Sequence, residues 1–145
     1  MIKLFLLQEE LSNYAKGISH GHVPKLNEVC IARFADGNWY RAACVDVSPN
    51  AKETLFTCIQ VDYGYIDKID IPFIRRIPKR FVEFLPFQAH HAILEGFETI
   101  EIVSKELVVR LAEILPTNSV RTVNIVRRHD DHVAFVVRIP DVNLP

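Results

Sequence analysis

The chain has 145 residues, 49% of them hydrophobic and 24% charged, which is the composition of a globular domain and excludes a disordered chain. Its formal net charge is −1, so it lacks the basic excess of a general nucleic-acid binder, and nucleic acid is not an expected partner. No apolar run approaches the roughly 20 residues of a membrane-spanning helix, so we expect no association with a membrane.

The N-terminal segment, residues 1–25, predicts a short strand followed by a helix. The run "IKLFLL" is typical of a short buried strand. In the following "QEELSNYAKGI" the apolar side chains recur at helical spacing, and Gly17 is a typical end signal. The apolar positions of this helix are Leu7, Leu11, Tyr14, Ala15 and Ile18.

From Val29 onward the apolar residues follow the period of strands. Four short runs, "EVCIARF", "NWYRAACVDV", "TLFTCIQVDY" and "YIDKIDI", are separated by turn-forming residues, which predicts a small, strongly bent barrel. Alternation in the third run places one set of side chains on the core face, namely Leu55, Thr57, Ile59 and Val61, and the other set on the opposite face, namely Phe56, Cys58, Gln60 and Asp62. The cysteines match no zinc-binding spacing, and we interpret Cys30, Cys44 and Cys58 as reduced structural thiols of an intracellular protein.

The rest of the chain predicts a mixture of irregular, strand and helical segments. The proline-containing stretch "IPFIRRIPKRFVEFLP" predicts an irregular segment around the barrel, and "FQAHHAILEGF" predicts another strand. Residues 104–115 predict a helix with Ser104 as its N-cap, and "RTVNIVRRHDDHVAFVVRIP" predicts a terminal hairpin. Because the segments at the two ends are too small to bury their apolar faces alone, we expect them to pack together as a second lobe.

Four aromatic residues lie next to the predicted turns of the barrel. Phe34 and Tyr40 flank a tight hairpin, and Tyr63 and Tyr65 bracket the glycine turn. Rings at one rim of a barrel attract a cation, and each contact contributes about 0.5–2 kcal/mol. On spacing alone, however, aromatic residues that simply cover the end of a barrel are the favoured interpretation.

Three motifs in register resemble a known family. The stretches "VCIARFADGNWYRAACVDV", "VDYGYIDKI" and "IRRIPKRFVEFLPFQAHHAILEG" are similar to those of extended Tudor domains. The resemblance implies a β-rich α+β fold, in which an SH3-like Tudor barrel is inserted in a staphylococcal-nuclease-like lobe of OB type and joined to it by a helix. It assigns residues 1–25 to the N-terminal part of that lobe, residues 26–98 to the barrel and its wrapping segment, and residues 99–145 to the linker helix and C-terminal hairpin.

The resemblance also implies a function. Extended Tudor domains read arginine-containing peptides, usually symmetrically dimethylated arginine in the tails of Piwi-clade Argonautes. It implies a scaffold protein of the germline piRNA pathway, cytoplasmic and in the perinuclear germ granule (nuage), with other germ-granule proteins as further partners. The peptide would lie in a groove between barrel and lobe.

The positions of the family's aromatic cage are only partly matched in this chain. Phe34, Tyr40 and Tyr63 match it, whereas Gln60 replaces an aromatic residue and Tyr65 replaces the asparagine that binds the guanidinium. Because Gln60 offers a carbonyl acceptor and Tyr65 a hydroxyl, we hypothesise that the pocket tolerates or prefers unmethylated arginine. Asp62 either adds a negative charge to this pocket or supports the turn. The alternative is a structural or self-association module with a dead cage, with RNA contacts along residues 75–80.

Other signals are given plainer interpretations. The six histidines form no convincing metal-binding pattern, so neither a metal nor another cofactor is expected. The predicted strands of the lobe are nearly free of carboxylates, which metal-dependent nucleases require, so we expect no enzymatic activity. We interpret Trp39 as a packing residue. The basic cluster, consisting of Arg75, Arg76, Lys79 and Arg80, is interpreted as a solvated surface loop.

Overall fold

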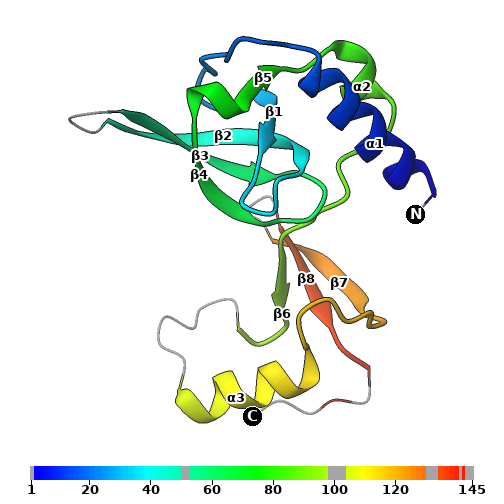
Figure 1. Cartoon of the computed structure of the whole chain (residues 1–145). Helices are drawn as coiled ribbons and strands as arrows, with labels where there is room; N and C mark the ends of the chain where they lie inside the picture. The colour runs from blue at the N-terminus through cyan, green and yellow to red at the C-terminus, as the bar shows by residue number, and fades with distance from the viewer. Residues whose placement is uncertain (1, 50–52, 98–103, 130–133, 141, 143–145) are drawn as a thin grey trace. The chain divides into compact units, whose positions relative to one another are not determined.

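The computed structural model describes residues 2–49, 53–97, 104–129, 134–140 and 142. The chain divides into two compact units, Met1–Ala89 and His90–Pro145 (Figure 1). The first unit contains the aromatic residues singled out by the sequence. No helix among the described residues is long and apolar enough to cross a membrane.

The first unit is built on a five-stranded antiparallel sheet with the strand order β4-β3-β2-β1-β5 (Figure 1). Its strands are β1 (Val29–Arg33), β2 (Trp39–Pro49), β3 (Thr54–Gln60), β4 (Ile66–Asp70) and β5 (Ile74–Arg76). The four strand runs predicted from residue 29 onward are therefore confirmed. The two tight turns use glycines with positive φ, Gly37 at +83° and Gly64 at +82°, a conformation that other residues adopt only with strain. A register shift between Cys44 and Asp46 marks a bulge in β2, which bends the strand.

The N-terminal segment is one helix, α1 (Ile2–Lys16), and the predicted strand over "IKLFLL" is wrong. The helical stripe starts earlier than the sequence analysis placed it, because Leu4 continues the spacing of Leu7 and Leu11. The stripe packs on barrel residues, namely Ile31, Trp39 and Phe81. The helix lies in the same compact unit as the sheet. The assignment of residues 1–25 to the N-terminal part of the lobe stays a prediction.

The predicted faces of β3 are reversed in the structure. Phe56 and Cys58 are 3% and 0% exposed and belong to the barrel core, whereas Leu55 and Ile59 are only half-buried. The reason is that both faces of this strand carry apolar side chains, so alternation separates two faces without saying which one is inside. The same reversal turns Gln60 inward.

The burial of the cysteines and of the tryptophan confirms two interpretations from the sequence. The three cysteines are buried and free, as expected of structural thiols. A hydrogen bond with the thiol of Cys58, together with burial, raises the pKa of Cys30. Trp39 is 6% exposed and packs with α1, which confirms it as a packing residue.

The segment after β4 is more regular than predicted. It forms a 3-10 turn, η1 (Ile71–Phe73), then β5 and a short helix, α2 (Lys79–Glu83). Asp70 caps the turn, because its carboxylate accepts a hydrogen bond of 2.7 Å from the N–H of Ile71. The strand predicted for "FQAHHAILEGF" is limited to three residues, β6 (Ala92–Leu94).

The second unit combines β6, a helix and a hairpin. The helix α3 (Lys105–Ile114) is capped by Ser104, whose Oγ accepts a 3.2 Å hydrogen bond from the N–H of Leu107, as predicted. The strands β7 (Asn124–His129) and β8 (Ala134–Arg138) form the predicted antiparallel hairpin, and β6 pairs with β8 in parallel. The polar turn of this hairpin, residues 130–133, lies outside the described residues.

Candidate functional site

Three of the predicted cage residues form a chain of edge-to-face ring contacts. Phe34 follows β1, Tyr40 lies in β2, and Tyr63 lies in the turn between β3 and β4. The ring centroids of Phe34 and Tyr40 are 5.5 Å apart with an interplanar angle of 89°. The rings of Tyr40 and Tyr63 are 5.7 Å apart at 82°. Phe34 is buried, whereas Tyr63 is 45% exposed, so the cluster runs from the barrel core to the surface.

A cavity of about 390 Å³ lies beside these rings. Its lining consists of Phe34, Ala35, Asp36, Tyr40, Gln60, Tyr65, Ile66 and Asp67. The structure thus brings four of the six predicted site residues to one cavity. Tyr63 is not part of this lining, but its ring contacts that of Tyr40, and Asp62 has a different role.

Gln60 is the polar member of this lining that the structure buries. Its side chain is buried with the residue 4% exposed, and its carbonyl oxygen Oε1 has no hydrogen-bond partner among the described residues. Its backbone is fixed on both sides, since its N–H donates to Tyr65 and its carbonyl accepts from Gly64, both at 2.8 Å. A buried acceptor without a donor lowers stability by about 1–3 kcal/mol. A ligand that donates a hydrogen bond to this oxygen would recover part of that free energy on binding.

Two carboxylates in the lining were not among the predicted site residues. Asp36, in the hairpin turn, accepts hydrogen bonds from the Tyr40 hydroxyl and from the N–H of Asn38, the latter at 3.0 Å. Asp67 lines the same cavity from β4. The signal for Asp36 was present in the sequence, because it lies in the tight hairpin turn only four residues before Tyr40.

The contact between Asp36 and Tyr40 changes the acidity of both groups. Burial would raise the pKa of Asp36, but the hydrogen bonds from Tyr40 and Asn38 outweigh it and hold this pKa below its ordinary value. Burial and the hydrogen bond to Asp36 raise the pKa of Tyr40 to about 12. At neutral pH the cavity therefore presents an ionised carboxylate beside a neutral tyrosine.

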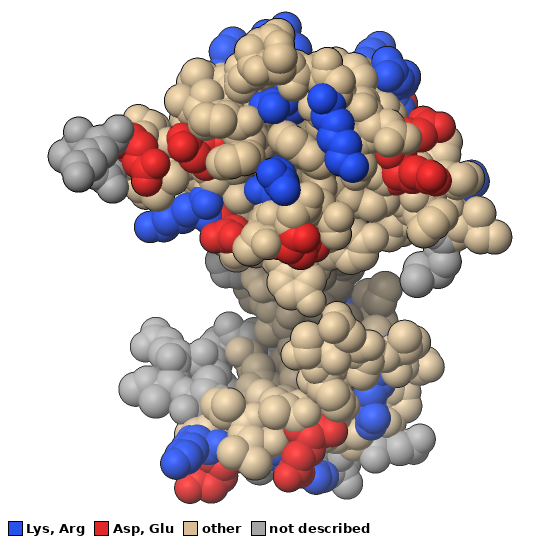
Figure 2. Space-filling model, viewed as in Figure 1, with Lys and Arg blue, Asp and Glu red and all other residues tan. Residues whose placement is uncertain are grey.

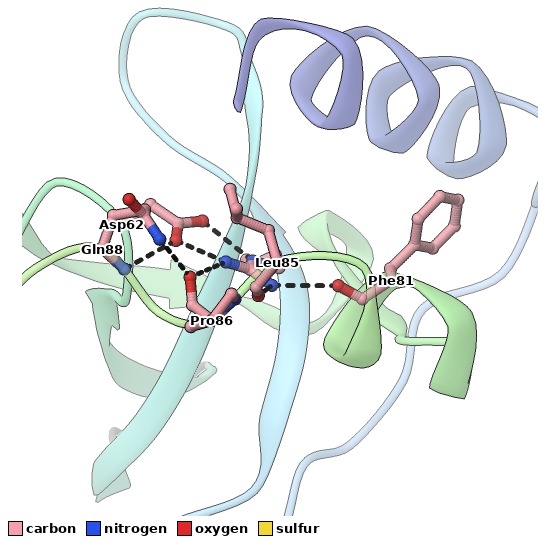
Figure 3. A network of polar contacts seen from close by, with 6 residues as sticks. Asp62, Phe81, Leu85, Pro86 and Gln88 are labelled. Carbon is pink, nitrogen blue, oxygen red and sulfur yellow. Dashed lines mark hydrogen bonds and ion pairs between the residues drawn. The ribbon is translucent and has the colours of Figure 1, made fainter. Parts of the chain in front are cut away.

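Asp62 is paired with a buried arginine and supports the turn (Figure 3). Arg41 donates to Asp62 from Nε at 2.8 Å and from Nη2 at 2.5 Å, and their side chains are 0% and 5% exposed. Asp62 also accepts a 3.1 Å hydrogen bond from the N–H of Gln88. Of the two roles considered for Asp62, this geometry favours support of the turn that carries Tyr63.

The same arginine holds the wrapping segment (Figure 3). Its Nη1 donates to the carbonyls of Phe81 and Leu85 at 3.0 and 2.7 Å, and its Nη2 donates to that of Pro86 at 3.3 Å. The guanidinium is therefore shared between the aromatic turn and the segment from Phe81 to Gln88. The sequence analysis did not identify Arg41, because a charged residue in a strand gives no sign of which partner it will meet.

The basic cluster is only in part a solvated surface. Arg76, Lys79 and Arg80 are exposed, as predicted. Arg75 is buried against the ring of Trp39, and its guanidinium donates to backbone carbonyls. On the face in Figure 2, basic and acidic side chains of the first unit are interspersed instead of forming one basic patch.

Comparison with known proteins identifies the family. The model of the Tudor domain matches residues 2–96, so the chain belongs to the Tudor domain family, whose members are interaction modules. Mouse RING finger protein 17 is 33% identical over 100 residues, which cover 63% of this chain and 6% of that protein. The mouse ATP-dependent RNA helicase TDRD9 is 42% identical over 69 residues, covering 46% of this chain and 5% of the helicase. The chain thus spans a small part of these relatives.

Solved structures identify the subclass as the extended Tudor domain. The extended Tudor domain of human TDRD1, in complex with a symmetrically dimethylated peptide, matches with a TM-score of 0.79 at 26% identity over 93% of this chain and 65% of that one. The TD3 domain of mouse TDRD1, in complex with a MILI peptide containing dimethylarginine, gives 0.78 at 23% identity over 97% and 70%. The predicted family and its mixed, strand-rich fold are confirmed.

Proposed function

We propose that this domain is a non-catalytic module that binds an arginine-containing peptide, with one arginine side chain in the cavity next to Tyr40. The observation that carries the proposal is the chain of rings from Phe34 to Tyr63 beside a cavity with carboxylates in its lining. A guanidinium is planar and always charged, so it stacks on aromatic rings and pairs with carboxylates. Tyr65 and Gln60 would complete the walls of the site.

Charge also favours a cationic ligand over nucleic acid. Asp36 and Asp67 line the cavity, and no lysine or arginine is part of its lining in the described part of the chain. A phosphate group would meet carboxylates there, whereas an arginine would meet opposite charge. The burial of Arg75 further weakens the alternative of RNA contacts along residues 75–80.

The class of partner is inferred from the structural neighbours. The domain of mouse TDRD1 was solved with a MILI peptide, and that of Drosophila Papi with a Piwi N-terminal peptide. By analogy, we propose an arginine-rich N-terminal tail of a Piwi-clade Argonaute as the ligand of this domain. The parent protein would then be a germline scaffold of the piRNA pathway in the perinuclear germ granule (nuage), together with other germ-granule proteins.

Calorimetric titration with an Arg-Gly/Arg-Ala tail peptide tests this proposal. The variant Tyr65→Ala removes one ring of the cavity lining and should weaken binding by about 2- to 30-fold, corresponding to about 0.5–2 kcal/mol for one cation–π contact. Phe84→Ala is the matched control, because Phe84 is 47% exposed, close to the 52% of Tyr65, but lies in the wrapping segment and is not part of the cavity lining. Absence of binding, or equal loss in both variants, would refute the proposal.

The alternative function, a self-association module with a dead cage, is favoured by a different observation. Three apolar side chains of α1 are exposed, namely Ile2 at 78%, Phe5 at 70% and Leu6 at 46%. Their spacing puts them on one side of the helix, where a second protein surface could cover them. Sedimentation velocity distinguishes the two functions: a dimer that is lost in Phe5→Ser, together with no peptide binding, supports the alternative.

A further inference from the structure

We propose that the cavity selects arginine with free N–H groups, unmethylated before symmetrically dimethylated, because Gln60 and Asp36 act as hydrogen-bond acceptors for the guanidinium. This inference rests on the proposed function and specifies its ligand. The sequence suggested only that Gln60 breaks the aromatic wall. The structure adds that its oxygen is buried without a hydrogen-bond partner in the described part of the chain, and that Asp36 lies in the same lining.

The unpaired oxygen of Gln60 is the first observation. The residue lies at the end of β3, and its backbone is fixed by hydrogen bonds to Tyr65 and Gly64. Only its side chain is therefore free to adjust, and the terminal amide turns about a soft torsion. Oε1 is an acceptor, so the group that it lacks is a donor, which a guanidinium N–H supplies.

The carboxylate of Asp36 is the second observation. It accepts hydrogen bonds from the backbone N–H of Asn38, the side-chain amide of Asn38 and the hydroxyl of Tyr40. A carboxylate has about four acceptor positions, so one position remains for a ligand. These bonds also fix the carboxylate at the wall formed by Tyr40, so a guanidinium on that ring meets an acceptor already in place.

Asp67 adds a second negative charge to the lining, from strand β4. It lines the cavity, and its Oδ1 accepts a 2.8 Å hydrogen bond from the N–H of Lys68. Together with Asp36 it makes the lining net negative. This charge attracts every arginine equally, because methylation leaves the charge of the guanidinium unchanged. Attraction by charge therefore sets affinity, whereas the acceptors on Gln60 and Asp36 set the preference among methylation states.

Symmetric dimethylation changes both properties that these acceptors recognise. Each terminal nitrogen loses one N–H donor and gains a methyl group, which needs an apolar wall. In this cavity the buried amide of Gln60 is part of the lining. A symmetrically dimethylated guanidinium keeps three of its five N–H donors, so it has fewer donors to share between Oε1 of Gln60 and the carboxylate of Asp36, and it places a methyl group against a polar surface. The unmodified side chain should therefore bind more tightly.

The test is titration with one tail peptide in three forms, unmodified, monomethylated and symmetrically dimethylated. We expect the unmodified peptide to bind about tenfold more tightly than the dimethylated one, as expected for one hydrogen bond to a charged group. In Gln60→Phe, which restores an aromatic wall, this ratio should disappear or invert. Equal or tighter binding of the dimethylated peptide by the wild-type domain would overturn the inference.

A second variant keeps the test valid if the buried substitution disturbs folding. Asp36 lies in an exposed turn, so Asp36→Asn should leave the fold intact. It should weaken binding of the unmodified peptide more than binding of the dimethylated one. Glu53→Gln is the matched control, because Glu53 carries the same charge and lines a neighbouring pocket with Phe34 and Asp67, but is not part of the cavity lining. If all forms of the peptide bind but the ratio is the same in every variant, only this inference fails. If no form binds, the proposed function fails with it.

Discussion

Replacement of Arg41 by methionine should destabilise the first unit more than any substitution at its surface. Methionine keeps much of the volume of the side chain but removes every donor of the guanidinium. The change leaves Asp62 as a buried charge with 5% of its side chain exposed and deprives three backbone carbonyls of their donors. Removal of one partner of a buried ion pair typically costs about 3–5 kcal/mol, and a buried carbonyl left without its donor adds about 1 kcal/mol. We therefore expect the free energy of unfolding to fall by about 4 kcal/mol or more.

Urea denaturation followed by tryptophan fluorescence measures this loss. The chain has one tryptophan, Trp39, which is 6% exposed in the native state, so its emission reports unfolding of this unit. Arg76→Met is the matched control, because Arg76 is an exposed arginine on β5 and should change stability by less than about 0.5 kcal/mol. A second variant, Asp62→Asn, keeps the shape of the carboxylate and should lower stability less than Arg41→Met does.

The double variant separates the pair from its surroundings. If the network stabilises the fold as its geometry indicates, the double variant should lose clearly less stability than the sum of the losses in Arg41→Met and Asp62→Asn. The reason is that each single variant already breaks the contact between the two residues. A loss of stability below about 1 kcal/mol in Arg41→Met would show that water molecules replace Arg41 as hydrogen-bond donors to Asp62 and the three carbonyls. That result would refute the argument that buried Asp62 and these carbonyls depend on Arg41 for their donors.

Three further predictions concern other parts of the chain. Gly21→Ala should destabilise the first unit by about 1–3 kcal/mol in the same assay, because an added Cβ would lie 2.3 Å from the backbone oxygen of Ile71. Unchanged stability would mean that this loop moves freely. Ser104→Ala should cost about 1 kcal/mol and speed amide exchange in the first turn of α3, whereas equal exchange would exclude a role for the cap. In an ultraviolet titration one tyrosine should ionise near pH 12, and this transition should be absent in Tyr40→Phe. Its pKa is raised in the folded state, so its contribution to stability is complete below about pH 10 and is lost as the pH rises through about 12.

The sequence predicted the barrel well because its local signals agree with its packing. The turns at Gly37 and Gly64 require residues that tolerate positive φ, and apolar runs of strand period stand on either side of them. The helix at residues 104–115 was predicted for the same reason, since its cap and its stripe lie within one short segment. Such features are local and can be read without knowing the fold.

The predictions that were wrong or missing concern features that depend on tertiary contacts. The run "IKLFLL" is apolar enough for a buried strand, and only its packing against Trp39 and Phe81 decides for a helix. The faces of β3 were reversed because Phe56 and Leu55 are both suitable core residues. Asp36 was missed because a carboxylate in a turn is usually solvated, and its contact with Tyr40 forms only when the hairpin closes.

One strand connects the candidate site to the stability of the unit. Tyr40 and Arg41 are neighbours in β2 and point to opposite faces, as strand geometry requires. Tyr40 lines the cavity and touches Tyr63, while Arg41 holds Asp62, the residue directly before Tyr63 in the turn. The rings are thus fixed twice, once by their own contacts and once by the buried ion pair behind them. Because a ligand then binds rings that are already in place, little ordering is needed on binding, and substitutions at Arg41 should weaken peptide binding even under conditions where the domain remains folded.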